Sequence, residues 1–139
     1  MKGVISFDFD DTLASLSDEK QGLLWCIMDV LKPIQKVIDL VFEKHNEGYI
    51  IDIVTARDAW AIQEVRDFIE EHKLPIRKIH YTAGGSKVPI LKEIKSVLHV
   101  DDILNHVIQA EMNGIPCLLV DDGRHKNNTT ADQFDKILI

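Results

Sequence analysis

Apolar residues recur along this chain in two spacings that alternate from one end to the other. Short unbroken apolar runs are typical of strands that are buried on both faces of a sheet. Longer stretches with apolar residues at positions i, i+3, i+4 and i+7 indicate helices that place one face on a core. The short runs predict five strands, which are Val4–Phe7, Tyr49–Val54, Ile76–Tyr81, Val97–Val100 and Ile115–Val120.

The segments between these strands have helical spacing. The first helix places residues 34–42 on a core, with Pro33 suited to its first turn and Gly48 to its C-terminal cap. A second helix is predicted up to His72, with Asp58 as its N-cap. A short helix is predicted at Lys87–Lys95, and another one contains Leu104, Val107 and Ile108 and is stopped by Asn113-Gly114.

Two segments depart from this alternation. Residues 14–32 contain the apolar run Leu23–Met28 and predict either a hairpin-like flap or an extra helix. At the other end of the chain, Thr130 and Gln133 resemble a capping box. This pattern predicts a short terminal helix that contains Phe134, Ile137 and Leu138.

A strand followed by a helix, repeated along the chain, implies parallel strands joined by right-handed crossovers. The predicted fold class is therefore α/β, a three-layer α/β/α sandwich around a parallel five-stranded sheet. No internal repeat or linker divides the sequence, so we expect residues 1–139 to form a single domain.

Composition narrows the class of protein. The chain has 139 residues, 45% of them hydrophobic and 28% charged, which is ordinary for a globular protein. Sixteen Lys and Arg against 23 Asp and Glu give a net charge of −7, which argues against a general nucleic-acid coat but allows a local basic patch. The sequence has no apolar run long enough to cross a membrane and no leader pattern. Cys26 and Cys117 lie in apolar runs, which is typical of free thiols in a reducing compartment. We therefore expect a cytoplasmic protein.

Polar residues follow four of the predicted strands, at the ends where open α/β sheets bind ligands. Asp8-Phe9-Asp10-Asp11-Thr12 follows the first strand, Thr55-Ala56-Arg57-Asp58 the second, and Asp101-Asp102 the fourth. Lys87 opens a helix after the turn Gly84-Gly85-Ser86, which follows the third. Because parallel strands end at one edge of a sheet, we expect these side chains to converge.

The acidic run after the first strand has three interpretations. A polar turn would use Asp for its turn chemistry alone. A calcium loop would place Asp8, Asp10, Thr12 and Glu19 at ligand positions, but it needs a glycine where the chain has Leu13. A phosphoryl-transfer site would use clustered carboxylates to bind Mg²⁺, with one as nucleophile and another as acid and base. The acids and the lysine at other strand ends favour the third interpretation.

These motifs resemble those of the haloacid dehalogenase superfamily of phosphatases. The family's first motif, Asp-x-Asp-x-Thr/Val after an apolar strand, is matched by Asp8-Phe9-Asp10-Asp11-Thr12. Its Thr or Ser at a strand end is matched by Thr55, its helix-initial lysine by Lys87, and its acidic pair by Asp101-Asp102. The four motifs occur in the family's order and span residues 4–105.

The resemblance implies a role for each matched residue. Asp8 would be the nucleophile, and Asp10 would be the general acid and base. Thr55 would hold the transferring phosphoryl group, and Lys87 would neutralise the charge of that group and of Asp8.

The resemblance also implies a Mg²⁺ cofactor. The ion would be bound by Asp8, by the backbone carbonyl of Asp10 and by Asp101. Asp102 would either be a further ligand or hydrogen-bond to the ligands. Asn105 would act through water.

The expected substrate is a phosphorylated nucleotide, a nucleic-acid end or another phosphomonoester, with no membrane partner. Neither residues 14–32 nor residues 73–86 could hold a cap domain, so the chain resembles a capless family member with an open site, which a second copy of the chain could cover. Thr55-Ala56-Arg57 resembles the polynucleotide 3′-phosphatase branch, where the arginine helps to bind phosphate. We therefore expect Arg57 and Thr12 to bind substrate, whereas the structural alternative for Arg57 is a surface pair with Asp58.

Other residues receive structural interpretations. Trp25 and Trp60 are predicted to pack in the core or against the flap, and His99 to be buried and hydrogen-bonded. The run Arg124-His125-Lys126 predicts either a basic rim or a solvated segment. The main functional alternative is a non-catalytic phosphoacceptor module that resembles response-regulator receivers, although their phosphorylated Asp ends the third strand, where this chain has Tyr81-Thr82.

Overall fold

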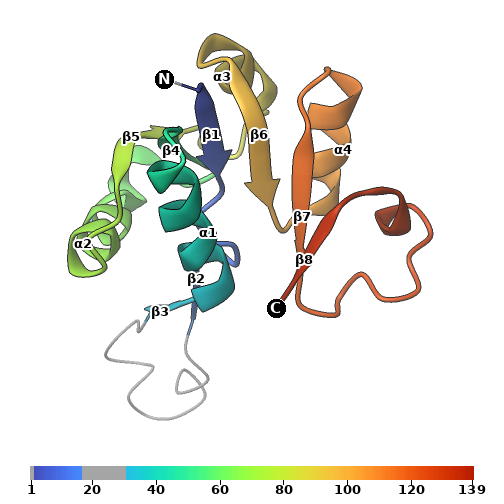
Figure 1. Ribbon diagram of the computed structural model, residues 1–139, viewed down its shortest axis with the longest axis horizontal. Helices are drawn as coiled ribbons and strands as arrows, with labels where there is room; N and C mark the ends of the chain where they lie inside the picture. The colour runs from blue at the N-terminus through green and yellow to red at the C-terminus, as the bar shows by residue number, and fades with distance from the viewer. Residues whose placement is uncertain (1, 17–30) are drawn as a thin grey trace.

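A sheet of six parallel strands forms the centre of the computed structural model, which describes residues 2–16 and 31–139 (Figure 1). Its strand order is β5-β4-β1-β6-β7-β8. The strands are β1 (Val4–Phe7), β4 (Ile50–Thr55), β5 (Ile76–Tyr81), β6 (Ser96–Asp101), β7 (Cys117–Asp121) and β8 (Lys136–Leu138). Counted along the chain, this is the order 3-2-1-4-5-6 of one doubly wound α/β class, and it differs from the 2-1-3-4-5 order of receiver modules.

The five predicted strands are confirmed, but the terminal helix is wrong. Residues 136–138 form the edge strand β8, in which Lys136 pairs in parallel with Leu119 of β7. The capping-box segment makes only the 3₁₀ turn Ala131–Gln133, where the Asn128 side chain accepts backbone N–H groups and Thr130 caps nothing. A helical run this short gains too few hydrogen bonds to propagate, whereas the free edge of β7 offers a full ladder to an extended chain.

Helices cover both faces of the sheet, and this confirms the predicted three-layer sandwich. Within the described residues, α1 (Gln35–Asn46) and α2 (Gln63–Glu71) pack on one face, and α3 (Val88–Glu93) and α4 (Leu104–Met112) pack on the other. Neighbouring residues of β4 show the alternation, since Ile53 belongs to the core beneath α1 and α2 and Val54 to the core beneath α3 and α4.

The ends of the first helix follow the sequence pattern closely. Val37 and Val41 of α1 are fully buried in the core. Gly48 has a φ of 102° and follows the C-cap, as predicted, which lets the chain turn directly into β4. Pro33 lies in β3, just before the helix rather than in its first turn.

The segment after the first motif begins and ends as a hairpin. β2 (Ala14–Leu16) and β3 (Leu31–Pro33) pair in antiparallel register at the carboxyl edge of the sheet (Figure 1). This agrees with the hairpin alternative for the ends of residues 14–32. The flap predicted from Leu23–Met28, which includes Trp25 and Cys26, lies outside the described residues.

The second helix begins later than predicted. Asp58 does not cap it, because its carboxylate accepts a hydrogen bond from Trp60 Nε1 at 3.0 Å. A 3₁₀ turn, Ala59–Ala61, separates β4 from α2. Trp60 is 84% exposed, so of its two predicted places the core is wrong, and packing against the flap falls on residues outside the described ones. Among the residues that the structure describes, no helix is long and apolar enough to cross a membrane.

Candidate active site

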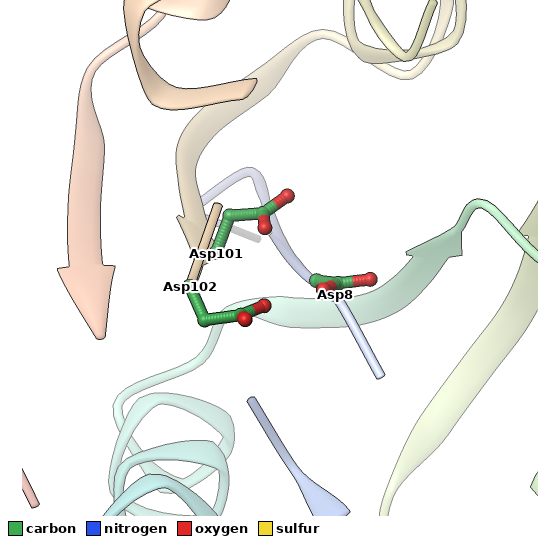
Figure 2. A group of neighbouring side chains, drawn as sticks. All are labelled: Asp8, Asp101 and Asp102. Atoms are coloured by element: carbon green, nitrogen blue, oxygen red, sulfur yellow. The ribbon is translucent and has the colours of Figure 1, made fainter. Parts of the chain in front are cut away.

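Three aspartates meet where the strand order reverses, between β1 and β6. Such a reversal opens a crevice at the carboxyl ends of the strands. Asp8 follows β1 and stays beside β6, because its backbone N–H donates to the carbonyl of Val100 at 2.8 Å. Asp101 ends β6 and Asp102 follows it, and both project toward Asp8 (Figure 2). One oxygen from each carboxylate lies within 4.8 Å of the others, and all three residues are buried.

A tight turn after Asp8 brings Thr12 back to this group. The carbonyl of Phe9 accepts the backbone N–H groups of residues 12–14 at 2.9–3.2 Å. The buried Thr12 hydroxyl therefore faces the cluster, where it lies 3.1 Å from Asp102 Oδ1 and 3.5 Å from Asp8 Oδ2. Thr12, which was predicted to bind substrate, here orients the carboxylate of Asp102.

Lys87 provides the positive charge between two of the aspartates. Its Nζ lies 2.9 Å from Asp8 Oδ1 and 2.8 Å from Asp101 Oδ2, and its side chain is 3% exposed. The loop that carries Lys87 is fixed to the loop after β4 by two backbone bonds, from Gly84 N–H to the carbonyl of Ala56 and from Ala83 N–H to the carbonyl of Arg57. Lys87 is therefore positioned both by its two aspartate partners and by the backbone bonds of its loop.

The charges in this group are unequally compensated. Burial, and then repulsion from Asp101, raise the pKa of Asp8 well above its ordinary value despite the attraction of Lys87. Burial would also lower the pKa of Lys87, but attraction to Asp8 and Asp101 outweighs it and the pKa rises. Lys87 thus pairs with both Asp8 and Asp101, and Asp8 is the less fully compensated of the two.

Asp101 accepts more hydrogen bonds than its neighbours. Its Oδ2 accepts from Lys87, from His99 Nε2 at 2.9 Å and from His106 Nδ1 at 3.1 Å, and its Oδ1 accepts the N–H of Ile103 at 3.0 Å. Burial alone would raise the pKa of Asp101, but the two histidines and Lys87 together lower it well below the ordinary value. A carboxylate offers about four lone-pair directions, so Asp101 has little capacity left for a metal ion.

His99 is buried and hydrogen-bonded, as predicted. Its Nδ1 lies 2.8 Å from Ser6 Oγ, which in turn lies 2.8 Å from Ser96 Oγ. Burial lowers the pKa of His99, so its neutral form donates from Nε2 to Asp101 and accepts from Ser6 at Nδ1. His106 was missed by the sequence analysis, although its place one turn into the helix that follows Asp101 was a usable signal.

Asp102 has a cationic partner that the sequence left undecided. Arg124 Nη1 lies 2.9 Å from Asp102 Oδ2, and the same guanidinium contacts Asp122 at 3.1 Å. His125 Nε2 lies 3.1 Å from the carbonyl of Asp102. Arg124 and His125 therefore contact the acidic group, whereas Lys126 is exposed, and both the basic rim and the solvated segment stay predictions.

Asp10 lies outside the group of three carboxylates and pairs with Arg57. The guanidinium donates from Nε at 2.9 Å and from Nη2 at 2.8 Å to the two oxygens of Asp10, whose side chain is about half exposed. Arg57 also donates from Nη1 to the carbonyl of Ala61 at 2.9 Å, and its Cζ lies 5.2 Å from the centre of the Phe9 ring. The structural alternative for Arg57, a pair with Asp58, is not what the structure shows.

Thr55 ends β4 and is fully buried. Its Oγ1 accepts the backbone N–H of Arg57 at 3.2 Å, which fixes the start of the loop that carries the guanidinium. The structure thus places Thr55 and Arg57 on one rigid turn beside Asp10.

The donor set suits a hard divalent cation. Asp8, Asp101 and Asp102 offer only oxygen ligands, and the group is short of positive charge at Asp8. Mg²⁺ prefers carboxylate oxygens and tolerates few protein ligands because it keeps part of its water shell. Asp8 and Asp102 retain the most free lone pairs, so they are the best-placed ligands in the group.

Comparison with known proteins was made at the level of sequence and of fold. No family model and no curated protein matches this sequence. Among solved structures, a haloacid dehalogenase-like hydrolase from Bacteroides fragilis superposes with a TM-score of 0.69 at 14% identity, over 99% of this chain and 97% of that one. The chain has the haloacid dehalogenase-like fold. A β-phosphoglucomutase from Thermotoga maritima superposes with a TM-score of 0.62 at 12% identity, over 98% of this chain and 93% of that one.

The resemblance drawn from the four motifs is thus confirmed at the level of fold. In this fold Asp8 and Asp102 follow neighbouring strands and lie close together, and Lys87 reaches Asp8 from another loop. The closer resemblance to the polynucleotide 3′-phosphatase branch stays a prediction.

Proposed function

We propose that this protein is a Mg²⁺-dependent phosphatase that hydrolyses a phosphomonoester through an aspartyl-phosphate intermediate. One observation carries the proposal: Asp8, Asp101 and Asp102 lie within 4.8 Å of one another at the strand-order reversal, with Lys87 between two of them. Three buried carboxylates beside one another are costly unless cations offset them, and a phosphate ester brought by Mg²⁺ needs such a site.

Asp8 is the nucleophile in this mechanism. Its carboxylate attacks phosphorus, the bond from phosphorus to the ester oxygen breaks, and Asp10 gives its proton to the leaving alkoxide. Asp10 then removes a proton from water, whose oxygen attacks the phosphoryl group. This second attack regenerates the Asp8 carboxylate and releases inorganic phosphate.

The metal would be held by Asp8, Asp102 and the backbone carbonyl of Asp10, and Asp101 would act mainly by orienting Lys87. Bound Mg²⁺ would draw Asp8 and the phosphoryl group together and offset their negative charges. Lys87 offsets the remaining charge from the opposite side of Asp8. Thr55 holds the phosphoryl oxygens at the end of β4.

For the substrate we propose a nucleotide or a nucleic-acid 3′-phosphate, supported by the position of Arg57. Its guanidinium donates two parallel hydrogen bonds to the carboxylate of Asp10. A guanidinium can donate to a phosphate group with the same bidentate geometry. A substrate phosphate would therefore compete for Arg57 and release Asp10 for proton transfer. The receiver-like alternative gains no support, because its strand order differs.

The test is phosphate release from p-nitrophenyl phosphate in Mg²⁺ and in EDTA. Asp8→Asn and Asp10→Asn should each lose turnover by several orders of magnitude, since one removes the nucleophile and the other the acid. Asp39→Asn, an exposed carboxylate of α1, is the matched control and should retain full activity. Full turnover by Asp8→Asn or in EDTA would refute the mechanism, and a stable phosphoprotein without turnover would support the receiver-like alternative.

A further inference from the structure

Trp60 presents a large apolar surface at the edge of the site. Its side chain is 84% exposed, the highest value among the exposed large hydrophobic residues that the structure describes. It lies in the 3₁₀ turn Ala59–Ala61, directly after the loop that carries Thr55 and Arg57. A single exposed apolar residue is ordinary, so it is the position of this indole directly after the loop of Arg57, together with its exposure, that points to a ligand.

One hydrogen bond orients the ring, and backbone contacts connect its turn to the site. Trp60 Nε1 donates to Asp58 Oδ2 at 3.0 Å, which orients the indole. The next residue, Ala61, accepts from Arg57 Nη1 at 2.9 Å, and Arg57 in turn holds Asp10. Two short contacts therefore connect the turn of Trp60 to the proposed acid and base.

A second aromatic residue lies at the same edge of the sheet. Tyr81 ends β5 in register with Thr55 and is 48% exposed. By contrast, the arginines at this edge are already paired, Arg57 with Asp10 and Arg124 with Asp102 and Asp122. With a net charge of −7, the chain would repel a long polyanion. These pairs and the net charge favour uncharged contacts as the source of affinity for the non-reacting part of a substrate.

We propose that Trp60 is a stacking platform for the nucleobase next to the phosphate that Asp8 attacks. This inference rests on the proposed function and names the substrate class of the same site, a phosphomonoester that carries a base close to the reacting phosphate. Every base has a flat π face, so an aromatic platform binds a single nucleotide with little dependence on sequence.

Fluorescence tests the contact without requiring turnover. Trp25→Phe leaves Trp60 as the sole tryptophan, since the chain has two. In a Trp25→Phe/Asp8→Asn protein with Mg²⁺, a nucleoside 3′-monophosphate should quench this emission by stacking, and β-glycerophosphate, which has no base, should not. A 3′-phosphorylated octanucleotide distinguishes a free nucleotide from a nucleic-acid end as the ligand. We expect it to bind more weakly than the mononucleotide, because the net negative charge of the protein repels its additional phosphates. Equal emission with and without the nucleotide would overturn the proposal.

Kinetics tests selectivity. The ratio of kcat/KM for the nucleotide to kcat/KM for β-glycerophosphate should fall about ten- to a hundredfold in Trp60→Ala, the range that stacking supplies. Trp60→Phe should restore most of the ratio, because its ring still stacks. Met112→Ala, a change at an equally exposed residue of α4, is the control and should leave the ratio unchanged.

Failure of the platform can be told apart from failure of the proposed function. If the wild type hydrolyses neither substrate, the phosphatase proposal fails, and the fluorescence result alone decides whether Trp60 binds a base. If both are hydrolysed and Trp60→Ala keeps the ratio, only the platform is wrong. A wild type that elutes as a dimer and a Trp60→Ala variant that elutes as a monomer would also overturn it, because Trp60 would then be a subunit contact.

Discussion

Replacing Lys87 with Met should expose the charge imbalance at Asp8. Methionine keeps most of the volume of the lysine stem, so the packing survives while the positive charge is lost. Asp101 retains His99, His106 and the N–H of Ile103 as donors, whereas Asp8 retains, among the described residues, a 3.5 Å contact with Thr12 and a contact with the carboxyl group of Asp102, which brings no positive charge. Asp8 therefore suffers most of the loss.

The size of the effect follows from the proton that Asp8 must then take up. A buried carboxylate without a cation becomes neutral rather than stay charged. At pH 7, protonating a group whose ordinary pKa is 3.8 costs at most about 4 kcal/mol, at 1.36 kcal/mol for each pH unit. Breaking a buried ion pair typically costs about 3–5 kcal/mol. Because wild-type Asp8 already has a raised pKa, we expect a loss of about 2–4 kcal/mol at pH 7.

The pH dependence has a definite sign. A group whose pKa is raised in the folded state favours folding at low pH and opposes it as the pH rises above the unfolded value of 3.8. The loss in Lys87→Met should therefore shrink to below about 2 kcal/mol at pH 5.

Urea unfolding in EDTA, followed by circular dichroism at pH 5 and pH 7, measures both values. Lys44→Met removes a partly exposed pair with Glu47 and is the matched control, with an expected loss below about 0.5 kcal/mol. A loss below about 1 kcal/mol at pH 7, or the same loss at both pH values, would refute the reasoning that Asp8 is left uncompensated.

Three further predictions address other groups. Arg57→Lys should lower kcat/KM at least about tenfold but change the free energy of unfolding by less than about 1 kcal/mol, because the forked contact with half-exposed Asp10 is lost while the charge remains; equal kcat/KM would contradict it. Asp102→Asn should weaken Mn²⁺ binding, measured by electron paramagnetic resonance titration, at least about tenfold and more than Asp101→Asn does, since Asp101 is occupied by protein donors; the reverse order would exchange their roles. Burial raises the pKa of the Cys117 thiol to about 12. In a Cys26→Ser variant, iodoacetamide at pH 8 should therefore alkylate Cys117 of the native protein at least about a hundredfold more slowly than Cys117 of the protein unfolded in urea. Equal rates would show that the thiol is accessible in the native protein.

Hydrophobic spacing was sufficient to predict the four inner strands, the edge strand β5 and the three layers. The inner strands are mostly buried on both faces, so nearly every residue of a run such as Val4–Phe7 must be apolar. The terminal strand β8 was not predicted, because its residues are not equally buried and Ile137 and Leu138 fit either a helix or an edge strand. Only the free edge of β7, a tertiary feature, decides between them.

The convergence of acids was predictable, but their partners were not. Parallel topology alone brings Asp8 and Asp101 to one edge of the sheet. Which cation meets which carboxylate depends on loop geometry that no local pattern encodes. Arg57 therefore pairs with Asp10, and Arg124 reaches Asp102 across the sheet edge. Trp60 shows the same limit, since an apolar residue in a short turn after a strand has the same sequence signature whether it points inward or outward.

The buried carboxylates of this chain differ in how fully they are neutralised, and that difference separates structure from function. Asp52 is fully buried in β4, away from the site, where Arg77 contacts it at 2.7 and 3.0 Å and His80 at 2.9 Å. Asp8 is almost as buried, yet its one cationic contact among the described residues is a lysine that it shares with Asp101. A carboxylate kept only for stability would be expected to have its full set of donors, as Asp52 does. The shortage at Asp8 is a cost to the folded protein, and a divalent cation together with a phosphoryl group is the kind of ligand that would remove it.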